Sequence, residues 1–176
     1  MLHAPEDSTL VLVDFQPRLM PAIHEGERVM HQAQRLGRIA QLLDVPIIGT
    51  EQNRHGLGET VPDIGVLCSR IVMKHHFDAC EDGLVEALPP GRRHVIVTGC
   101  EAHVCVLQTV AGLMAHGLKI TLVADAVGSR KTLDRDTAIA RLARAGVEIA
   151  TVEMVAFEWL RSSRHPRFRD VLRLIK

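Results

Sequence analysis

Three side chains that could cooperate in covalent catalysis each follow closely on a short apolar or β-branched run of the sequence. They are Asp14, Lys74 and Cys105. The carboxyl ends of parallel strands meet at one edge of a sheet, so these groups are expected to lie close together if the runs are strands. A thiolate nucleophile needs a base that accepts its proton and a cation that stabilises its charge. The trio therefore predicts a nucleophilic Cys105 with Asp14 as base and Lys74 as cationic partner.

Cys105 falls in the first turn of a predicted helix, at the end of the segment Thr98–Cys105. The partial positive charge of a helix N-terminus favours a thiolate and lowers the thiol pKa. The free backbone N–H groups at a helix start can also bind a developing oxyanion. A buried structural cysteine, packed as a small hydrophobe, explains the position equally well.

Short apolar runs alternate along the chain with longer helical patterns, which is typical of βαβ units and a parallel sheet. The predicted strands are Thr9–Val13, Pro46–Thr50, Arg70–Met73, His94–Thr98, Lys119–Ala124 and Val147–Thr151. The predicted helices are Glu27–Leu43, His103–His116, Thr132–Ala145 and Phe168–Lys176. The run Val95–Val97 is apolar throughout, which indicates a sheet covered by helices on both faces. We expect residues 1–176 to form a single α/β domain.

The helix predicted over His103–His116 is apolar around almost its whole circumference. Such a helix is buried on all sides. In a chain of 176 residues, that pattern predicts a subunit interface on its outer side, and hence a homo-oligomer, either a dimer or a larger assembly.

The composition excludes several classes of partner and location. The chain has 21 basic and 21 acidic residues, so no overall field attracts nucleic acid or an anionic membrane. No apolar run approaches the ~18 residues of a membrane helix, and no signal peptide is recognisable at the N-terminus. The four cysteines are expected to be reduced thiols, which favours a cytoplasmic protein.

The C-terminal segment Arg161–Lys176 is strongly basic, with six Arg or Lys residues against one Asp. It could bind anions or nucleic acid. The solvated face of an amphipathic terminal helix is the favoured interpretation.

The sequence predicts neither a metal nor a cofactor. The ten histidines and four cysteines include two groups that could bind a metal, His75 with His76 and Cys80, and His103 with Cys105. Neither group has the paired ligand spacing of a structural zinc site. The glycine-rich motifs of dinucleotide and phosphate sites do not occur.

At several places the chain resembles the isochorismatase-like cysteine hydrolases, and in particular the branch of the isochorismatase domain-containing proteins. The matching segments are Val13–Gln16, Thr50–Gln52, Gly56–Gly58, Lys74, Thr98–Thr109 and Ala124–Arg130. The likeness runs from about Thr9 to the terminal helix, which is nearly the whole chain.

This resemblance implies a three-layer α/β/α sandwich around a six-stranded parallel sheet with the strand order 3-2-1-4-5-6. It would bring Asp14, Lys74 and Cys105 together as a catalytic triad. It also implies a cis peptide bond between Cys100 and Glu101, and an oxyanion hole formed by the backbone N–H groups of Glu101 and Cys105.

The activity implied by the resemblance is hydrolysis of the C–N bond of a small non-peptide amide through a thioester on Cys105. Nicotinamidases carry an Asp-x-His metal motif where this chain has Thr50–Gln52, so the metal site of that branch is not expected. The side chains expected to line the substrate pocket are Phe15, Gln16, Gln52 and Phe77.

Two other functions remain open at this point. One is a catalytically silent scaffold or interaction subunit with the same fold. The other is a redox-sensing thiol protein in which Cys100 and Cys105 are partners, although their spacing across a strand–helix turn is poor for a disulfide.

Overall fold

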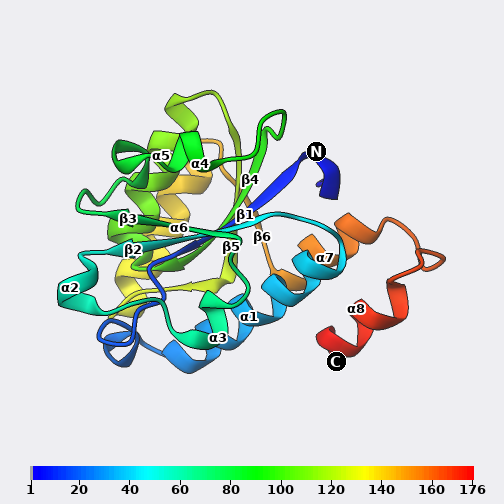
Figure 1. Ribbon diagram of the computed structural model, residues 1–176, viewed down its shortest axis with the longest axis horizontal. Helices are drawn as coiled ribbons and strands as arrows, with labels where there is room; N and C mark the ends of the chain where they lie inside the picture. The colour runs from blue at the N-terminus through cyan, green and yellow to red at the C-terminus, as the bar shows by residue number, and fades with distance from the viewer. Residues whose placement is uncertain (1) are drawn as a thin grey trace.

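The computed structural model describes residues 2–176 and contains one sheet of six parallel strands (Figure 1). The strand order is β3-β2-β1-β4-β5-β6. The strands are β1 (Ser8–Val13), β2 (Ile47–Gln52), β3 (Arg70–Lys74), β4 (His94–Cys100), β5 (Lys119–Gly128) and β6 (Glu148–Ala150). This is the order that the resemblance implies, and the predicted fold class is confirmed.

Helices cover both faces of the sheet, as the layers in Figure 1 show. One face carries α1 (Gly26–Leu42), α3 (Pro62–Gly65), α7 (Val152–Leu160) and α8 (Phe168–Ile175). The other face carries α4 (Leu84–Ala87), α5 (Leu107–Ala115) and α6 (Thr132–Arg144). Each layer encloses its own apolar cluster against the sheet. Within residues 2–176, none of these helices is both long enough and apolar enough to cross a membrane.

The predicted strands and the helices α1, α6 and α8 are confirmed, with ends that differ by a few residues. The central strands β1 and β4 are buried along their whole length, which explains their unbroken apolar sequence. Strand β5 runs on to Gly128, beyond its predicted end at Ala124. Four helices have no counterpart in the sequence prediction: α2 (Arg54–Leu57), α3, α4 and α7.

The segment that follows β4 departs from the prediction at its start. It opens with a π-helical turn, η4 (Ala102–Val106), before α5 begins. Ala111 and Ala115, on the outer side of α5, are exposed. In the single chain only one side of α5 packs on the sheet, so the outer side is open to solvent; its burial by another subunit stays a prediction.

The basic C-terminal segment ends in the amphipathic helix α8. Its Val171 is completely buried, and Phe168 and Leu174 pack against the cluster that contains α1. The side chain of Arg173 is 78% exposed. The charged residues of α8 thus form its solvent face, as the amphipathic pattern predicts.

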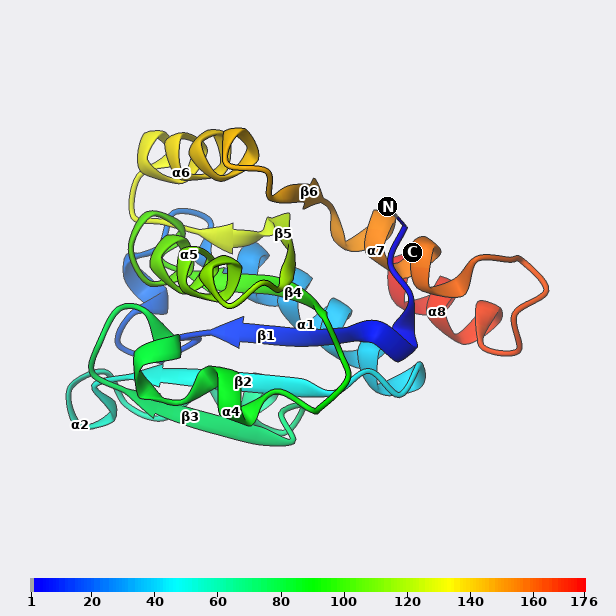
Figure 2. The ribbon, with the colours of Figure 1, turned by 90° about the horizontal axis from the view of Figure 1, so that it is seen from above.

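Strands β1 and β4 lie side by side in the middle of the sheet (Figure 2). Strand β1 is followed by α1 on one face, and β4 by α5 on the other, so their carboxyl ends make a topological switch point. Val13 pairs with Thr50 of β2 and with Gly99 of β4. Residues that directly follow these strands are consequently brought together.

Gly99 permits the close approach of β4 to β1 at this point. Its φ is +125°, and a Cβ atom placed on it would lie 2.1 Å from the carbonyl oxygen of Val13. A side chain here meets both backbone strain and an immovable backbone atom.

We expect Gly99→Ala to reduce the free energy of unfolding by clearly more than Gly117→Ala. Gly117 also has a positive φ, +76°, but no atom lies within 4 Å of its Cβ position. Gly117→Ala should lower the free energy of unfolding by ~1–3 kcal/mol, because it introduces backbone strain alone. Gly99→Ala should lower it further, because the new Cβ atom also clashes with Val13. Urea unfolding measures both; equal losses would mean that the approach of the two strands is not constrained by Gly99.

Candidate active site

A buried ion pair joins the ends of β1 and β3. The Nζ atom of Lys74 lies 2.8 Å from Oδ2 of Asp14, and both side chains are completely buried. The hydroxyl of Thr50 donates to Oδ1 of Asp14 over 2.5 Å. The carboxylate is thus paired on one oxygen and hydrogen-bonded on the other, which is what a buried charge requires.

Gln52, at the end of β2, connects the ammonium group to the thiol. Its Oε1 atom accepts a hydrogen bond of 2.7 Å from Nζ of Lys74 and lies 3.9 Å from Sγ of Cys105. Its Nε2 atom donates to the carbonyl oxygen of His75 over 2.8 Å. That bond fixes the amide orientation, so Oε1 is the atom that faces the charged groups.

Gln16 holds the backbone of Gln52 in place. Its Oε1 atom accepts from the backbone N–H of Gln52 at 2.9 Å, and its Nε2 atom donates to the carbonyl oxygens of Gln52 at 3.0 Å and Gly58 at 2.6 Å. Gln16 is completely buried. These contacts make it a positioning residue for Gln52.

The thiol of Cys105 is protonated in this environment. Its pKa is raised to about 12, first because burial disfavours the thiolate and then because of the negative charge of Asp14, while the charge of Lys74 lowers it. The prediction of a pKa lowered by the helix start is therefore wrong, since burial and the neighbouring carboxylate outweigh it. A neutral thiol becomes a nucleophile only when a nearby base accepts its proton, and Asp14 is the adjacent base.

The loop between β4 and Cys105 is tied to the end of β5. The peptide bond between Cys100 and Glu101 is cis. The carboxylate of Glu101 accepts from the backbone N–H of Arg130 at 3.2 Å and from its Nε at 2.9 Å. His103 contacts the Ser129 hydroxyl through Nδ1 at 3.0 Å.

The predicted pocket residues fall in different places. Phe77 is 50% exposed, and its carbonyl oxygen accepts from the Thr109 hydroxyl of α5 at 3.3 Å. Phe15 is completely buried in the apolar cluster that contains α1, whereas Cys105 belongs to the cluster on the opposite face. The structure therefore brings Gln52 to the thiol and leaves Phe15 in the core.

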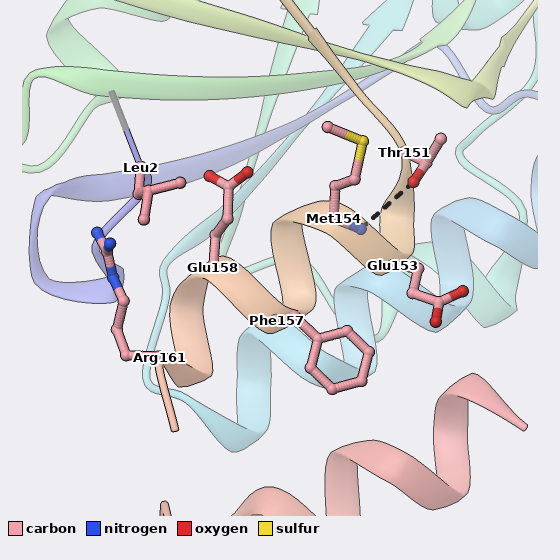
Figure 3. A pocket seen from close by; sticks show the side chains of 7 residues that line it. All are labelled: Leu2, Thr151, Glu153, Met154, Phe157, Glu158 and Arg161. Carbon is pink, nitrogen blue, oxygen red and sulfur yellow. Dashed lines mark hydrogen bonds between the residues drawn. The ribbon is translucent and has the colours of Figure 1, made fainter. Parts of the chain in front are cut away.

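Access to the thiol is narrow in the single chain. Cys105 is 6% exposed, and Asp14 and Lys74 are 0% and 1% exposed. A cavity of about 580 Å³ lies elsewhere, along α7 (Figure 3). It is lined by Leu2, Thr151, Glu153, Met154, Phe157, Glu158 and Arg161.

Two contributors to this site were not singled out as site residues in the sequence analysis. Thr50 binds Asp14, and Arg130 binds the carboxylate of Glu101. Their positions at the ends of β2 and β5 are the only signal that could have indicated them, because the ends of adjacent strands converge on one edge.

The structure thus places a cysteine beside a buried carboxylate–ammonium pair, at the switch point of a three-layer α/β/α fold. Residues 8–154 match the family model described as Isochorismatase domain. The chain therefore belongs to the isochorismatase family.

Relatives with this fold carry different descriptions. Isochorismatase domain-containing protein 2A from Mus musculus is 37% identical over 98% of this chain and 84% of its own length. The structure of MAR1 ribonuclease from Caenorhabditis elegans is 34% identical, with a TM-score of 0.94 over 99% of this chain and 92% of its own. The ycaC gene product of Escherichia coli, described as an octameric hydrolase of unknown specificity, shares the fold at 24% identity, with a TM-score of 0.86 over 98% of this chain and 95% of its own.

We expect the Asp14–Lys74 pair to be coupled in stability. Lys74→Met leaves a buried carboxylate without its partner and should cost ~3–5 kcal/mol of unfolding free energy. The double variant Asp14→Asn/Lys74→Met should lose less than the sum of the two single losses, because no unpaired charge remains. Urea unfolding of all four proteins gives the coupling.

The exposed pair Arg173–Asp170, at 3.4 Å, provides the control for this cycle. Its coupling should not exceed ~1 kcal/mol. Additive losses at Asp14 and Lys74 would contradict the ion pair described above.

Proposed function

We propose that this protein is a cysteine hydrolase that cleaves the C–N bond of a small non-peptide amide. The observation that carries the proposal is the buried Asp14–Lys74 pair beside the protonated thiol of Cys105. A base, a cation and a nucleophile in one place are what acyl transfer through a thioester requires.

The reaction begins when Asp14 accepts the proton of the Cys105 thiol. The sulfur attacks the amide carbonyl carbon, and Lys74 offsets the negative charge near the sulfur and the carboxylate. The oxyanion receives hydrogen bonds from the backbone N–H groups of Glu101 and Cys105, which lie at the start of the helical segment.

The tetrahedral intermediate collapses when its C–N bond breaks. Asp14 returns the proton to the leaving nitrogen, so that an amine or ammonia departs and a thioester remains on Cys105. Water, deprotonated by Asp14, then attacks the thioester. The carboxylic acid leaves as the proton returns to the sulfur.

Burial of the site favours a small substrate. Cys105 is 6% exposed, and Oε1 of Gln52 lies 3.9 Å from its sulfur. A short amide could reach the sulfur after small side-chain movements, whereas a peptide or a polynucleotide would need a larger opening.

RNA cleavage is the second candidate, because the C. elegans structure with 34% identity is described as a ribonuclease. The charges of this site argue against it. Lys74 is completely buried and already paired, so it is not available to a phosphate backbone, and the chain has no net positive charge.

We expect the wild-type protein to release ammonia from at least one member of a panel of short primary amides. Cys105→Ser should lower the rate by at least ~10³-fold, because it removes the nucleophile. Cys80→Ser is the matched control and should retain activity, since Cys80 lies outside the site on a 3₁₀ turn.

An RNA oligonucleotide belongs in the same assay as a competing substrate. RNA cleavage that is abolished in Cys105→Ser would replace amide hydrolysis as the function. Amide turnover that persists in Cys105→Ser would refute the nucleophile, and inactivity of the wild type on all substrates would favour a silent scaffold.

We propose further that the chain forms a homo-oligomer through the outer side of α5. Exposed Ala111 and Ala115 lie there beside half-buried Leu107 and Met114, which gives an apolar surface. The E. coli neighbour with the same fold is described as octameric.

We expect Ala111→Glu to weaken self-association at least ~10-fold, because it places a charge in an apolar interface. Ala140→Glu, at an exposed alanine of α6, is the control and should leave association unchanged. Sedimentation velocity at micromolar concentrations measures both. A monomeric wild type, or an Ala111→Glu protein that associates normally, would contradict the proposal.

A further inference from the structure

A second polar cluster lies at the amino edge of the sheet, at the end of the strands opposite to Cys105. His3 lies two residues before the short 3₁₀ turn Pro5–Asp7 that leads into β1, His94 begins β4, and Glu148 begins β6. His3 is 2% exposed and His94 is 6% exposed. These residues are far apart in sequence, and the parallel topology brings them together.

The two imidazoles converge on one point. Nε2 of His3 lies 2.6 Å from the hydroxyl oxygen of Thr121, and Nε2 of His94 lies 2.9 Å from the same oxygen. Oε2 of Glu148 lies 3.8 Å from Nε2 of His3. The ligand atoms of His3, His94 and Glu148 all lie within 4.8 Å of one another.

Glu158 sets the tautomer of His3. Nδ1 of His3 contacts the carboxylate of Glu158, which also accepts from the His3 backbone N–H at 3.0 Å. Glu158 projects from α7 towards the segment that carries Leu2 (Figure 3). With the proton on Nδ1, Nε2 presents a lone pair. A carboxylate behind a histidine in this way is typical of metal-binding histidines.

The ring of His94 packs against the ring of His3, with the two ring centroids 4.5 Å apart. This contact and the shared Thr121 hydroxyl hold the two Nε2 atoms next to each other.

We propose that His3, His94 and Glu148 form a binding site for a divalent cation of the Zn²⁺ class, with Glu158 orienting His3. Two imidazoles and a carboxylate are a ligand set that Zn²⁺ accepts, with water in the fourth position. The side chain of Glu148 is 45% exposed, so the ion can enter from that side.

Binding requires a modest rearrangement. Bonds of about 2.0–2.1 Å at tetrahedral angles place ligand atoms roughly 3.3 Å apart, so the present cluster contracts by on the order of 1 Å. The Thr121 hydroxyl stands where the two nitrogens converge and turns aside when the ion binds. The ion then ties the N-terminal segment to β4 and β6.

The site lies apart from the proposed chemistry at the carboxyl edge, so its role is to stabilise the fold. An ion that binds only the folded state raises the unfolding temperature, and the stabilisation grows with the logarithm of the free ion concentration above the Kd. The competing explanation is a purely hydrogen-bonded cluster, in which Thr121 donates to one histidine and accepts from the other.

The test is titration of the metal-free protein with Co²⁺, a spectroscopic substitute for Zn²⁺, followed by displacement with Zn²⁺. The protein carries Cys105→Ser to exclude thiolate binding, and its affinity tag is C-terminal and removed. We expect one equivalent per chain with the visible absorption of a tetrahedral site, and a higher unfolding temperature with Zn²⁺.

Four variants separate the site from unspecific binding. Glu148→Gln and Glu158→Gln should each weaken Zn²⁺ binding ~10–100-fold, and His116→Gln, at an exposed histidine of another surface, should leave it unchanged. Thr121→Val should retain or strengthen binding, since it removes the competing hydroxyl.

Circular dichroism of each variant verifies that it is folded. No binding by the folded parent protein would overturn the proposal, as would binding that is indifferent to Glu148→Gln and Glu158→Gln. A loss of binding in Thr121→Val comparable to that in Glu148→Gln would equally favour the hydrogen-bonded cluster over a metal site.

Discussion

Much of the organisation around the switch point depends on the cost of burying the charges of Asp14 and Lys74. Removing two charges from water is unfavourable unless they pair closely and their remaining hydrogen-bonding atoms are satisfied. Thr50 and Gln52 meet that condition from the neighbouring strand, and Gln16 in turn holds Gln52. The pair therefore requires the ends of β1, β2 and β3 to stay in one register.

The same pair determines how the thiol behaves. The turn after β4 places Sγ of Cys105 3.9 Å from Oε1 of Gln52, the oxygen that also accepts a hydrogen bond from Lys74. Burial and the Asp14 charge keep the thiol protonated, with a pKa of about 12. In the proposed reaction, this makes the resting protein unreactive, and the nucleophile forms only when the proton passes to Asp14 during attack on a bound substrate.

Much of this arrangement was predictable from the residues. The unbroken apolar runs of β1 and β4 indicate a doubly covered parallel sheet, and polar residues after such runs indicate a site at the carboxyl edge. The direction of the thiol pKa was not predictable, because it depends on the burial of Cys105 and the proximity of Asp14. The proximity of His3 and His94 was likewise not predictable from the sequence, because it results from the crossover connections and the placement of α7.

The central claim is that Asp14 and Lys74 act on the thiol with opposite signs, and alkylation of Cys105 by iodoacetamide at pH 8 tests it most directly. Mass spectrometry identifies the modified residue. Below the pKa, each unit of pKa changes the thiolate fraction about tenfold. We expect Asp14→Asn to lower the thiol pKa and speed alkylation of Cys105, and Lys74→Met to raise the pKa and slow it. Equal rates in all three proteins, or changes of the same sign, would contradict the account.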